Sequence, residues 1–376
     1  SYGAQGNDNL GTYYAYQDLY SIYNSLGEAG LISSRLPTPN LKWETNLNLN
    51  FGVDFSAFDN RLIASIDIYE RKSKDLLFSR PLAPSQGFSE IDANIGALRN
   101  RGIEGQIQVL PVRNKDFTWN VNLNFGHYKN KITELPQTEI ISGSIGQLGS
   151  TQKMVVGGSI YDFFIREWAG VDPATGDALW SKNETTTDGN GDKIITGRTT
   201  TNVYADADSY FQGSSLPDIY GGITNTFTYK NFELSFLFSY SIGGKVLDLD
   251  EVMISHTGNN QGRTWSKEAL KRWTPENTDT NYPRLTTTTT SWNSISSRFL
   301  YDATYARLKN LNFSYTLPQS LLSQAKLKDV KLKVNTENLF TFFGHKGMDP
   351  EQSVDGVTYY RYPAQKSVSF GVDISF

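Results

Sequence analysis

Three histidines are the side chains of this chain best suited to acid–base or metal chemistry, because the chain contains no cysteine. His127, His256 and His345 lie in three separate segments, and none stands in an HExxH motif or in the context of a catalytic triad. The absence of cysteine removes thiolate nucleophiles and thiolate metal sites. We therefore expect no catalytic residue, no enzymatic activity and no cofactor.

A short acidic segment offers the spacing with which a calcium loop begins. Asp188, Asn190 and Asp192 place side-chain oxygens at alternate positions. The rest of the pattern fails, because Lys193 stands where the sharp-turn glycine is needed and Thr199 where a bidentate glutamate is needed. The spacing favours an exposed acidic turn, with calcium binding as the alternative.

Three aromatic residues are candidates for binding a substrate. Tyr161, Trp168 and Trp180 lie in the longest stretch between predicted strands, at residues 132–216. Aromatic rings near the mouth of a channel can stack on sugars or contact apolar side chains. Packing within a loop explains the same residues equally well.

The composition indicates many strands joined by turns. Of the 376 residues, 20% are charged, 13% are aromatic and 32 are glycine. No apolar run reaches the roughly 18 residues of a membrane-spanning helix, but strands of a membrane barrel alternate and average to a mildly hydrophilic sequence. The 35 basic and 39 acidic residues give no polybasic character, so nucleic acid is not an expected partner.

Several segments alternate apolar and polar residues strictly, as strands between two different solvents do. In residues 117–125 an apolar face of Phe, Trp, Val, Leu and Phe opposes a face of Thr and Asn. Residues 43–55 and 367–376 repeat the pattern. The polar faces carry mostly Asn, Ser, Thr and Gly, which suits a wet lumen better than the outer surface of a soluble sandwich.

The pattern also predicts where individual side chains of these strands lie relative to the membrane and the lumen. Trp119 is expected in a membrane-interface belt at the short-turn rim and Trp43 in one at the loop rim. A phase slip near Lys309-Asn310 predicts a β-bulge. The charged residues expected to face the lumen, where they could anchor a plug or guide cargo, are Glu44, Asp54, Glu104, Glu233, Lys331, Lys333, Glu337 and Asp373.

Short and long connections alternate along the chain. The short ones are predicted at residues 58–61, 114–116, 230–231 and 318–326, and the long polar ones at 7–41, 79–98, 132–216, 246–298 and 342–365. A helix is expected at 265–273 and an exposed hairpin or tip at 185–201. The fold class is therefore all-β: about ten strands of a transmembrane antiparallel β-barrel, with short periplasmic turns, long extracellular loops and a last strand that ends at the short-turn rim.

Eleven short stretches, in order and nearly from end to end, resemble the SusC/RagA-type family of TonB-dependent outer-membrane transporters of Bacteroidetes. They are residues 1–7 (SYGAQGN), 39–44 (PNLKWE), 60–62 (NRL), 67–69 (DIY), 74–77 (KDLL), 94–104 (NIGALRNRGIE), 217–227 (PDIYGGITNTF), 272–278 (RWTPENT), 305–311 (YARLKNL), 337–341 (ENLFT) and 347–351 (GMDPE).

The resemblance implies a large plugged barrel in the bacterial outer membrane. Residues 1–376 look like the C-terminal portion of that barrel, without the plug domain and the segment that engages TonB. The implied partners are a SusD-like surface lipoprotein that covers the extracellular mouth, TonB and membrane lipid. The implied function is energised import of oligosaccharides or oligopeptides.

Two alternatives stay open at this point. One is a SusC-like scaffold subunit of a larger outer-membrane complex that has lost transport. The other is a soluble β-rich protein that binds or cleaves glycans, which would bury the apolar rows in a dry core and carry a pair of carboxylates.

Overall fold

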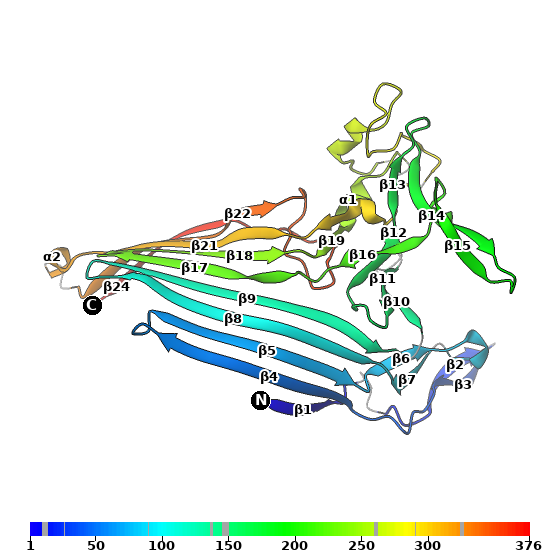
Figure 1. The fold of residues 1–376 in the computed structure, drawn as a ribbon, viewed down its shortest axis with the longest axis horizontal. Coiled ribbons are helices and arrows are strands. Elements are labelled where there is room, and N and C mark those ends of the chain that lie inside the picture. The colour runs from blue at the N-terminus through cyan, green and yellow to red at the C-terminus, as the bar shows by residue number, and fades with distance from the viewer. Residues whose placement is uncertain are drawn as a thin grey trace.

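A computed structural model describes residues 1–9, 14–25, 27–88, 90–135, 138–144, 150–258, 262–289, 291–323 and 327–376. Its main feature is one curved, fully antiparallel sheet of ten strands (Figure 1). In spatial order these are β1 (Tyr2–Asn7), β4 (Glu44–Ala57), β5 (Leu62–Lys74), β8 (Ala97–Arg113), β9 (Phe117–Glu134), β17 (Ile219–Tyr229), β18 (Phe232–Ile242), β21 (Tyr305–Thr316), β22 (Asp329–Phe343) and β24 (Ser367–Ser375). The sheet is open, with β1 and β24 as its edges. The all-β fold of about ten antiparallel strands is confirmed.

The connections gather by length at the two ends of the sheet, as the alternation predicted (Figure 1). At one rim are the tight turns and the helix α2 (Gln319–Leu322), which lies in the expected connection 318–326. The last three residues of that connection lie outside the described residues. The C-terminus lies at this rim and the long connections at the opposite one, as expected (Figure 1).

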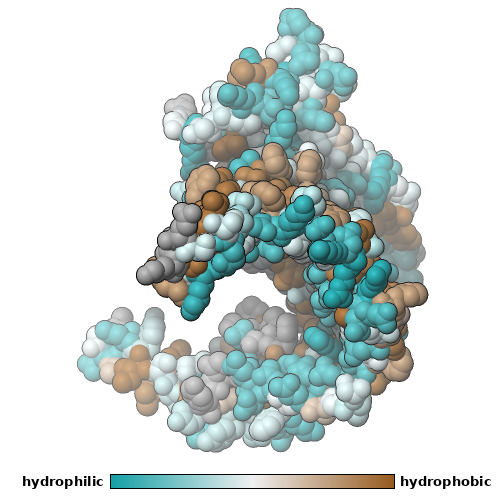
Figure 2. All heavy atoms as spheres, turned by 90° about the vertical axis from the view of Figure 1, so that its left-hand side faces the viewer, coloured by the Kyte–Doolittle hydropathy of each residue, from teal (hydrophilic) through white to brown (hydrophobic). Residues whose placement is uncertain are grey.

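The register of the strands separates an apolar face from a polar one. Leu123 pairs with Ile107 on one side and Ile223 on the other, while the adjacent Asn122 pairs with Gln108 and Thr224. Viewed along the strands from the short-turn rim, hydrophilic residues line the concave side of the wall and hydrophobic residues gather on the convex side (Figure 2).

The convex side is uncovered. Phe51, Val372 and Phe370 on this outer face are 68%, 57% and 80% exposed. A soluble sandwich would have buried these side chains in a dry core, so the structure does not support the soluble alternative.

Both predicted belt tryptophans lie near the rims expected for them. The Trp119 indole Nε1 donates to Asn225 Oδ1 at 3.1 Å. The side-chain amide of Asn225, which lies on the outer face, therefore has a hydrogen-bond partner. At the loop rim Trp43 is 66% exposed, and its ring covers Gly6, where a Cβ atom would lie 2.6 Å from the ring.

The predicted bulge is confirmed. Lys309 has no partner in the register of β21 with β18 or with β22, both of which shift between Leu308 and Asn310. On the β22 side the irregularity coincides with Asn338, whose φ is +51°.

Outside the sheet, the long connections fold into smaller sheets and short helices (Figure 1). The remaining strands are β2 (Leu19–Ser25), β3 (Glu28–Arg35), β6 (Leu77–Pro81), β7 (Glu90–Asn94), β10 (Glu139–Ser144), β11 (Ser150–Val155), β12 (Asp162–Arg166), β13 (Trp168–Val171), β14 (Ala178–Thr187), β15 (Lys193–Thr201), β16 (Ser209–Ser214), β19 (Lys245–Asp248), β20 (Leu300–Asp302) and β23 (Val357–Thr358). The helices are α1 (Leu249–Ile254) and the 3₁₀ turns Pro84–Gln86, Tyr204–Asp206, Lys267–Lys271 and Ser297–Phe299. Within the described ranges no helix is long and apolar enough to cross a membrane.

The loop side also contains a packed core. Its main buried cluster joins segments far apart in the sequence and consists of Phe163, Ile165, Leu247, Leu249, Val252, Ile295, Phe299 and Val357. The loops therefore form an ordered body on the rim of the sheet.

Two local expectations for the loops had different outcomes. The predicted exposed hairpin at 185–201 is present as the outer part of β14 and β15. The helix expected at 265–273 is shorter and tighter, a 3₁₀ turn over Lys267–Lys271. The Trp273 amide donates to the carbonyl of Tyr282 at 2.8 Å instead of continuing the helix.

Candidate functional site

The polar face of the sheet forms two adjacent hollows, of about 820 and 390 Å³. Both are lined by side chains of β5 and β8, and they share Asp67 and Glu104. The larger one also includes Tyr69 and Arg71, and the smaller one Tyr220. The concave wall therefore presents carboxylate, phenol and guanidinium groups among many amides.

Tyrosines lie flat on this wall because glycines make room for them. The ring of Tyr69 covers Gly102, where a Cβ atom would lie 2.5 Å from the ring, and Tyr220 covers Gly126 in the same way at 2.7 Å. Tyr128 meets Tyr220 edge to face, with ring centroids 6.2 Å apart. Three tyrosines from three strands thus make an aromatic surface, the luminal tyrosine strip.

Polar contacts hold the side chains around this strip. Asn50 Nδ2 donates to Asp67 Oδ1 at 2.9 Å, and Glu104 lines the same hollow as Tyr69. The Arg71 guanidinium lies 5.0 Å from the centre of the Tyr69 ring. Aromatic faces beside carboxylates and amides can bind sugar rings or the side chains and backbone of a peptide.

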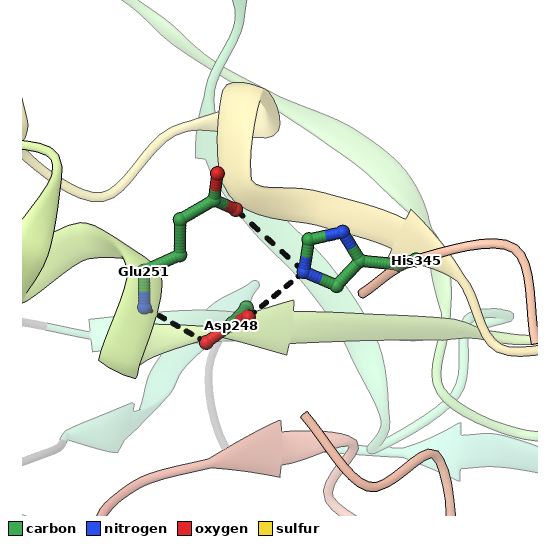
Figure 3. A group of neighbouring side chains, drawn as sticks. All are labelled: Asp248, Glu251 and His345. Carbon is green, nitrogen blue, oxygen red and sulfur yellow. Dashed lines mark hydrogen bonds and ion pairs between the residues drawn. The ribbon is translucent and has the colours of Figure 1, made fainter. Parts of the chain in front are cut away.

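At the loop rim a histidine and two carboxylates come together (Figure 3). His345 Nε2 lies 2.9 Å from Asp248 Oδ2 and 3.7 Å from Glu251 Oε2, and the three ligand atoms lie within 4.8 Å of one another. This donor set is of a kind that binds divalent metals. Each group already has a protein partner, since Asp248 also accepts the amide of Glu251 at 2.9 Å and Tyr301 donates to Glu251. We assign the cluster to joining α1 to the segment after β22.

The electrostatics of this cluster follow from burial. Burial raises the pKa of the Glu251 carboxyl above its ordinary value, while the Tyr301 hydroxyl and His345 act in the opposite direction with smaller effect. The Tyr301 ring stacks on His345 with centroids 3.5 Å apart and planes 10° apart.

The other two histidines have separate places. His256 is 2% exposed, and its Nδ1 accepts the Trp265 indole at 2.6 Å. Burial lowers the pKa of His256, which keeps the imidazole neutral. His127 lies on the outer face of β9 beside Ile103. The structure therefore does not bring the three histidines together.

The predicted substrate-binding aromatics lie in the loop body. Trp180 is 0% exposed and packs edge to face against Trp168 and Tyr204, with centroids 5.9 and 5.3 Å apart, in a cluster that includes Trp292. Trp168 and Tyr161 keep part of their surface exposed. The position of Trp180 therefore supports packing.

The acidic segment forms the tip of the hairpin between β14 and β15. Asp188 Oδ1 accepts the amides of Asn190 and Asp192, both at 2.8 Å, and the Asp188 amide donates to the carbonyl of Asp192 at 2.9 Å. These contacts are those of a side chain that closes its own turn.

A comparison with known proteins places the chain in a family. The family model described as TonB dependent receptor-like, beta-barrel matches residues 2–225, more than half of the 376 residues. The chain belongs to this family.

The relatives of this TonB-dependent receptor-like chain agree with the motifs. TonB-dependent receptor P3 of Formosa agariphila is 32% identical over the whole chain, which covers 39% of that protein, and TonB-dependent receptor SusC of Bacteroides thetaiotaomicron is 26% identical, with 37% covered. The RagAB peptide transporter structure matches with 28% identity and a TM-score of 0.82, over all of this chain and 40% of that one. The chain thus spans about two fifths of these relatives.

Two earlier predictions are thereby confirmed. The chain is of the SusC/RagA type, and it is an outer-membrane β-barrel protein. The named relatives are receptors and a transporter rather than enzymes.

Two stretches that carried the SusC/RagA resemblance, residues 305–311 and 347–351, meet at the loop rim of the sheet. Arg307 is almost fully buried, with its Nη2 2.5 Å from Asp349 Oδ1 and its Nη1 2.8 Å from Glu351 Oε2. Lys309 reaches the same Glu351 at 2.6 Å. Burial alone would raise the pKa of Asp349, but the Ala364 amide and the Arg307 guanidinium lower it below its ordinary value. This ion-pair network fastens the last long loop to the wall.

Sequence reasoning missed the luminal tyrosine strip and this network. The strip depends on the register between strands, which sets Tyr69 opposite Gly102, and the network depends on a loop that returns to β21. A usable signal was present, because Tyr69, Gly102 and Tyr220 each stand between two outward-facing residues of their strands. Of the charged residues expected to face the lumen, Glu104 lines both hollows, and Lys331 lies 3.7 Å from Glu233.

Proposed function

We propose that this chain supplies the C-terminal part of the barrel of an outer-membrane active transporter energised through TonB. The observation that carries the proposal is the wall itself, which turns bare apolar side chains outward and holds the luminal tyrosine strip on its concave side. Such a wall suits passage of a polar cargo through an apolar membrane. The likeness to the RagAB peptide transporter supports this reading.

The proposed cargo is an oligopeptide or an oligosaccharide. The first is favoured by the RagAB likeness, and both fit a wall that combines tyrosine rings with Asp67, Glu104 and amides. At the mouth Tyr161 and Trp168 are the proposed additional contacts, whereas Trp180 could contact cargo only if its cluster opened.

The proposed partner is a SusD-like lipoprotein seated on the loop side. The hairpin of β2 and β3 extends from that rim and exposes apolar side chains, with Ile22 at 79%, Leu31 at 76% and Tyr23 at 63%. Exposed apolar groups of this size in a protein loop commonly mark a contact surface.

Uptake by the full natural protein in its own outer membrane tests the proposal. Replacing both Tyr69 and Tyr220 by Ala should reduce uptake of a labelled oligopeptide mixture or oligosaccharide mixture by roughly tenfold below saturation, since stacking on two rings is lost. The matched control is Tyr229→Ala on the outer face, which should leave uptake unchanged.

The alternative is a scaffold subunit without transport. It predicts that the unmodified protein assembles with its partners and takes up neither cargo class, and that result would overturn the proposal. Equal uptake by the double variant and the control would instead contradict the role of the luminal tyrosine strip.

A further inference from the structure

A row of cations lies on the outer face of the sheet, on the loop side. Arg99 and Arg101 of β8 share that face with Ile103, and Lys129 and Lys131 of β9 lie directly opposite the two arginines. The residues between them on the chain face the concave side, where Asn100 lines the larger hollow. The cations therefore point away from the lumen.

The row has few negative partners. On the neighbouring strand β5, Glu70 contacts Arg101, and it lies 2.6 Å from Lys72. Within the part of the chain that the structure describes, no ion pair joins Arg99, Lys129 or Lys131 to a carboxylate. Among the described residues, Glu70 is the one carboxylate that forms ion pairs with any of Lys72, Arg99, Arg101, Lys129 and Lys131, although the chain as a whole has a net charge of −4.

These cations border a groove rather than a flat surface. The groove has a volume of about 450 Å³ and is lined by Ile68, Arg99, Arg101, Gly102, Ile103, His127, Lys129 and Lys131. One of its ends is cationic, and the other is made of Ile68, Ile103 and His127. Strands β5, β8 and β9, which supply it, are neighbours in the sheet (Figure 1).

The groove lies at the edge of the lipid-facing band. From Ile103 to Val112, the last apolar outward residue of β8, the strand extends about 30 Å, and at a tilt of about 40° this spans about 23 Å of membrane thickness. The apolar band of an outer-membrane barrel is about 25 Å tall. Arg101 and Lys129 therefore stand at the level of the lipid headgroups.

We propose that this groove binds the phosphate group of a phosphorylated membrane lipid in the leaflet on the long-loop side. The arginine fork and the lysine ammonium groups match phosphate oxygens, and the acyl chains continue along Ile68 and Ile103. A second copy of the chain is disfavoured, because two such rows facing each other would repel. An acidic protein would have to reach down to the level of the headgroups.

Lipid titration of the full natural protein in a zwitterionic detergent tests the assignment. The probes are a short-chain phosphatidic acid, a phosphatidylcholine with the same acyl chains, and inorganic phosphate. We expect the phosphatidic acid to bind most tightly. Lys129→Gln with Lys131→Gln should weaken its binding about 30-fold. Lys193→Gln with Lys346→Gln, an equal loss of charge on exposed loops, should leave it unchanged.

Each other outcome overturns the proposal. If the Lys129→Gln, Lys131→Gln variant and the loop control bound phosphatidic acid with equal affinity, the cations would not belong to the binding site. If inorganic phosphate bound as tightly as phosphatidic acid, the groove would be a site for small anions. If the protein were a dimer that dissociated only in the Lys129→Gln, Lys131→Gln variant, the groove would bind a second copy of the chain. Should the lysine variant fail to assemble, Arg99→Gln with Arg101→Gln provides the same comparison.

Discussion

The wall and the loop body are built for different surroundings. Both buried hydrophobic clusters found among the described residues lie in the loop body, where Leu247 and Phe299 are 0% exposed. On the wall, apolar residues of similar size such as Phe51 remain mostly exposed. Loops that face water must bury their apolar side chains against one another, whereas the wall leaves them outward for acyl chains to cover.

The two regions consequently gain stability from different sources. Each fully buried Leu or Phe of the loop body contributes about 1.5–3 kcal/mol relative to exposure to water. The wall depends on its continuous backbone register and on the lipid, because no water can satisfy an unpaired backbone group at membrane depth. Substitutions on the wall should therefore affect assembly in the membrane, whereas substitutions in the loop body should affect the local stability of the loops.

The largest expected effect is on the wall. Leu123→Arg places a charge on the lipid face between Ile107 and Ile223, which costs about 2–4 kcal/mol near the membrane midplane. We expect little assembled protein in the outer membrane, measured by heat-resistant mobility in a detergent gel.

The neighbouring position supplies the control. Asn122→Arg points toward Gln108 and Thr224 on the wet side and should assemble normally. Equal loss of heat-resistant mobility in both variants would contradict the assignment of faces.

A cavity in the loop body should have a more local effect, because its cost falls on the loops and leaves assembly of the wall intact. Phe299→Ala removes a fully buried ring from the main cluster, which typically costs about 3–5 kcal/mol. We expect heat-resistant mobility to persist while the loops become sensitive to added protease in intact cells. Phe51→Ala on the wall is the matched control and should leave the loops resistant. Loss of assembly in Phe299→Ala would show that the two regions fold as one unit.

The smallest expected effect is a pH dependence confined to α1. Because burial raises the pKa of Glu251, its stabilising contribution is complete below the ordinary carboxyl pKa and is lost as the pH rises through the raised value. Glu251→Gln keeps a hydrogen-bond partner for Tyr301 and removes that loss.

Hydrogen exchange of residues 249–254 measures this effect. At pH 7 exchange should be slower in Glu251→Gln than in the unmodified protein, and the two should converge near pH 4. Glu268→Gln, at an exposed ion pair with Lys271, should change neither. Faster exchange in Glu251→Gln at pH 7 would mean that the charged carboxylate is needed beside His345.

The wall could be predicted from the sequence because its rule is local. Alternation of period two assigns each residue to lipid or lumen, and a phase slip reveals the extra residue at Lys309. The loop body follows no such rule. Trp180 is buried by Trp292, which lies more than a hundred residues further along the chain, so its packing could not be distinguished from a place at the mouth.

The candidate site was predictable in part for the same reason. The polar composition of the concave face follows from the alternation, but the position of Tyr69 over Gly102 requires knowing which strands are neighbours and at what offset. The cations of β8 and β9 are visible in the sequence. That they lie opposite one another at the edge of the apolar band follows only from the pairing of the two strands.

The bulge at Lys309 lets a single strand obey two incompatible phases. Below it, Phe313 and Leu311 face outward with their polar neighbours inward; beyond it, the inserted residue resets the count so that Arg307 turns inward against Ser239. If Lys309 instead continued the regular alternation without a bulge, Arg307 would turn to the outer face and Asp349 would lose its counter-ion. The bulge thus decides which side of the wall carries the charge of Arg307.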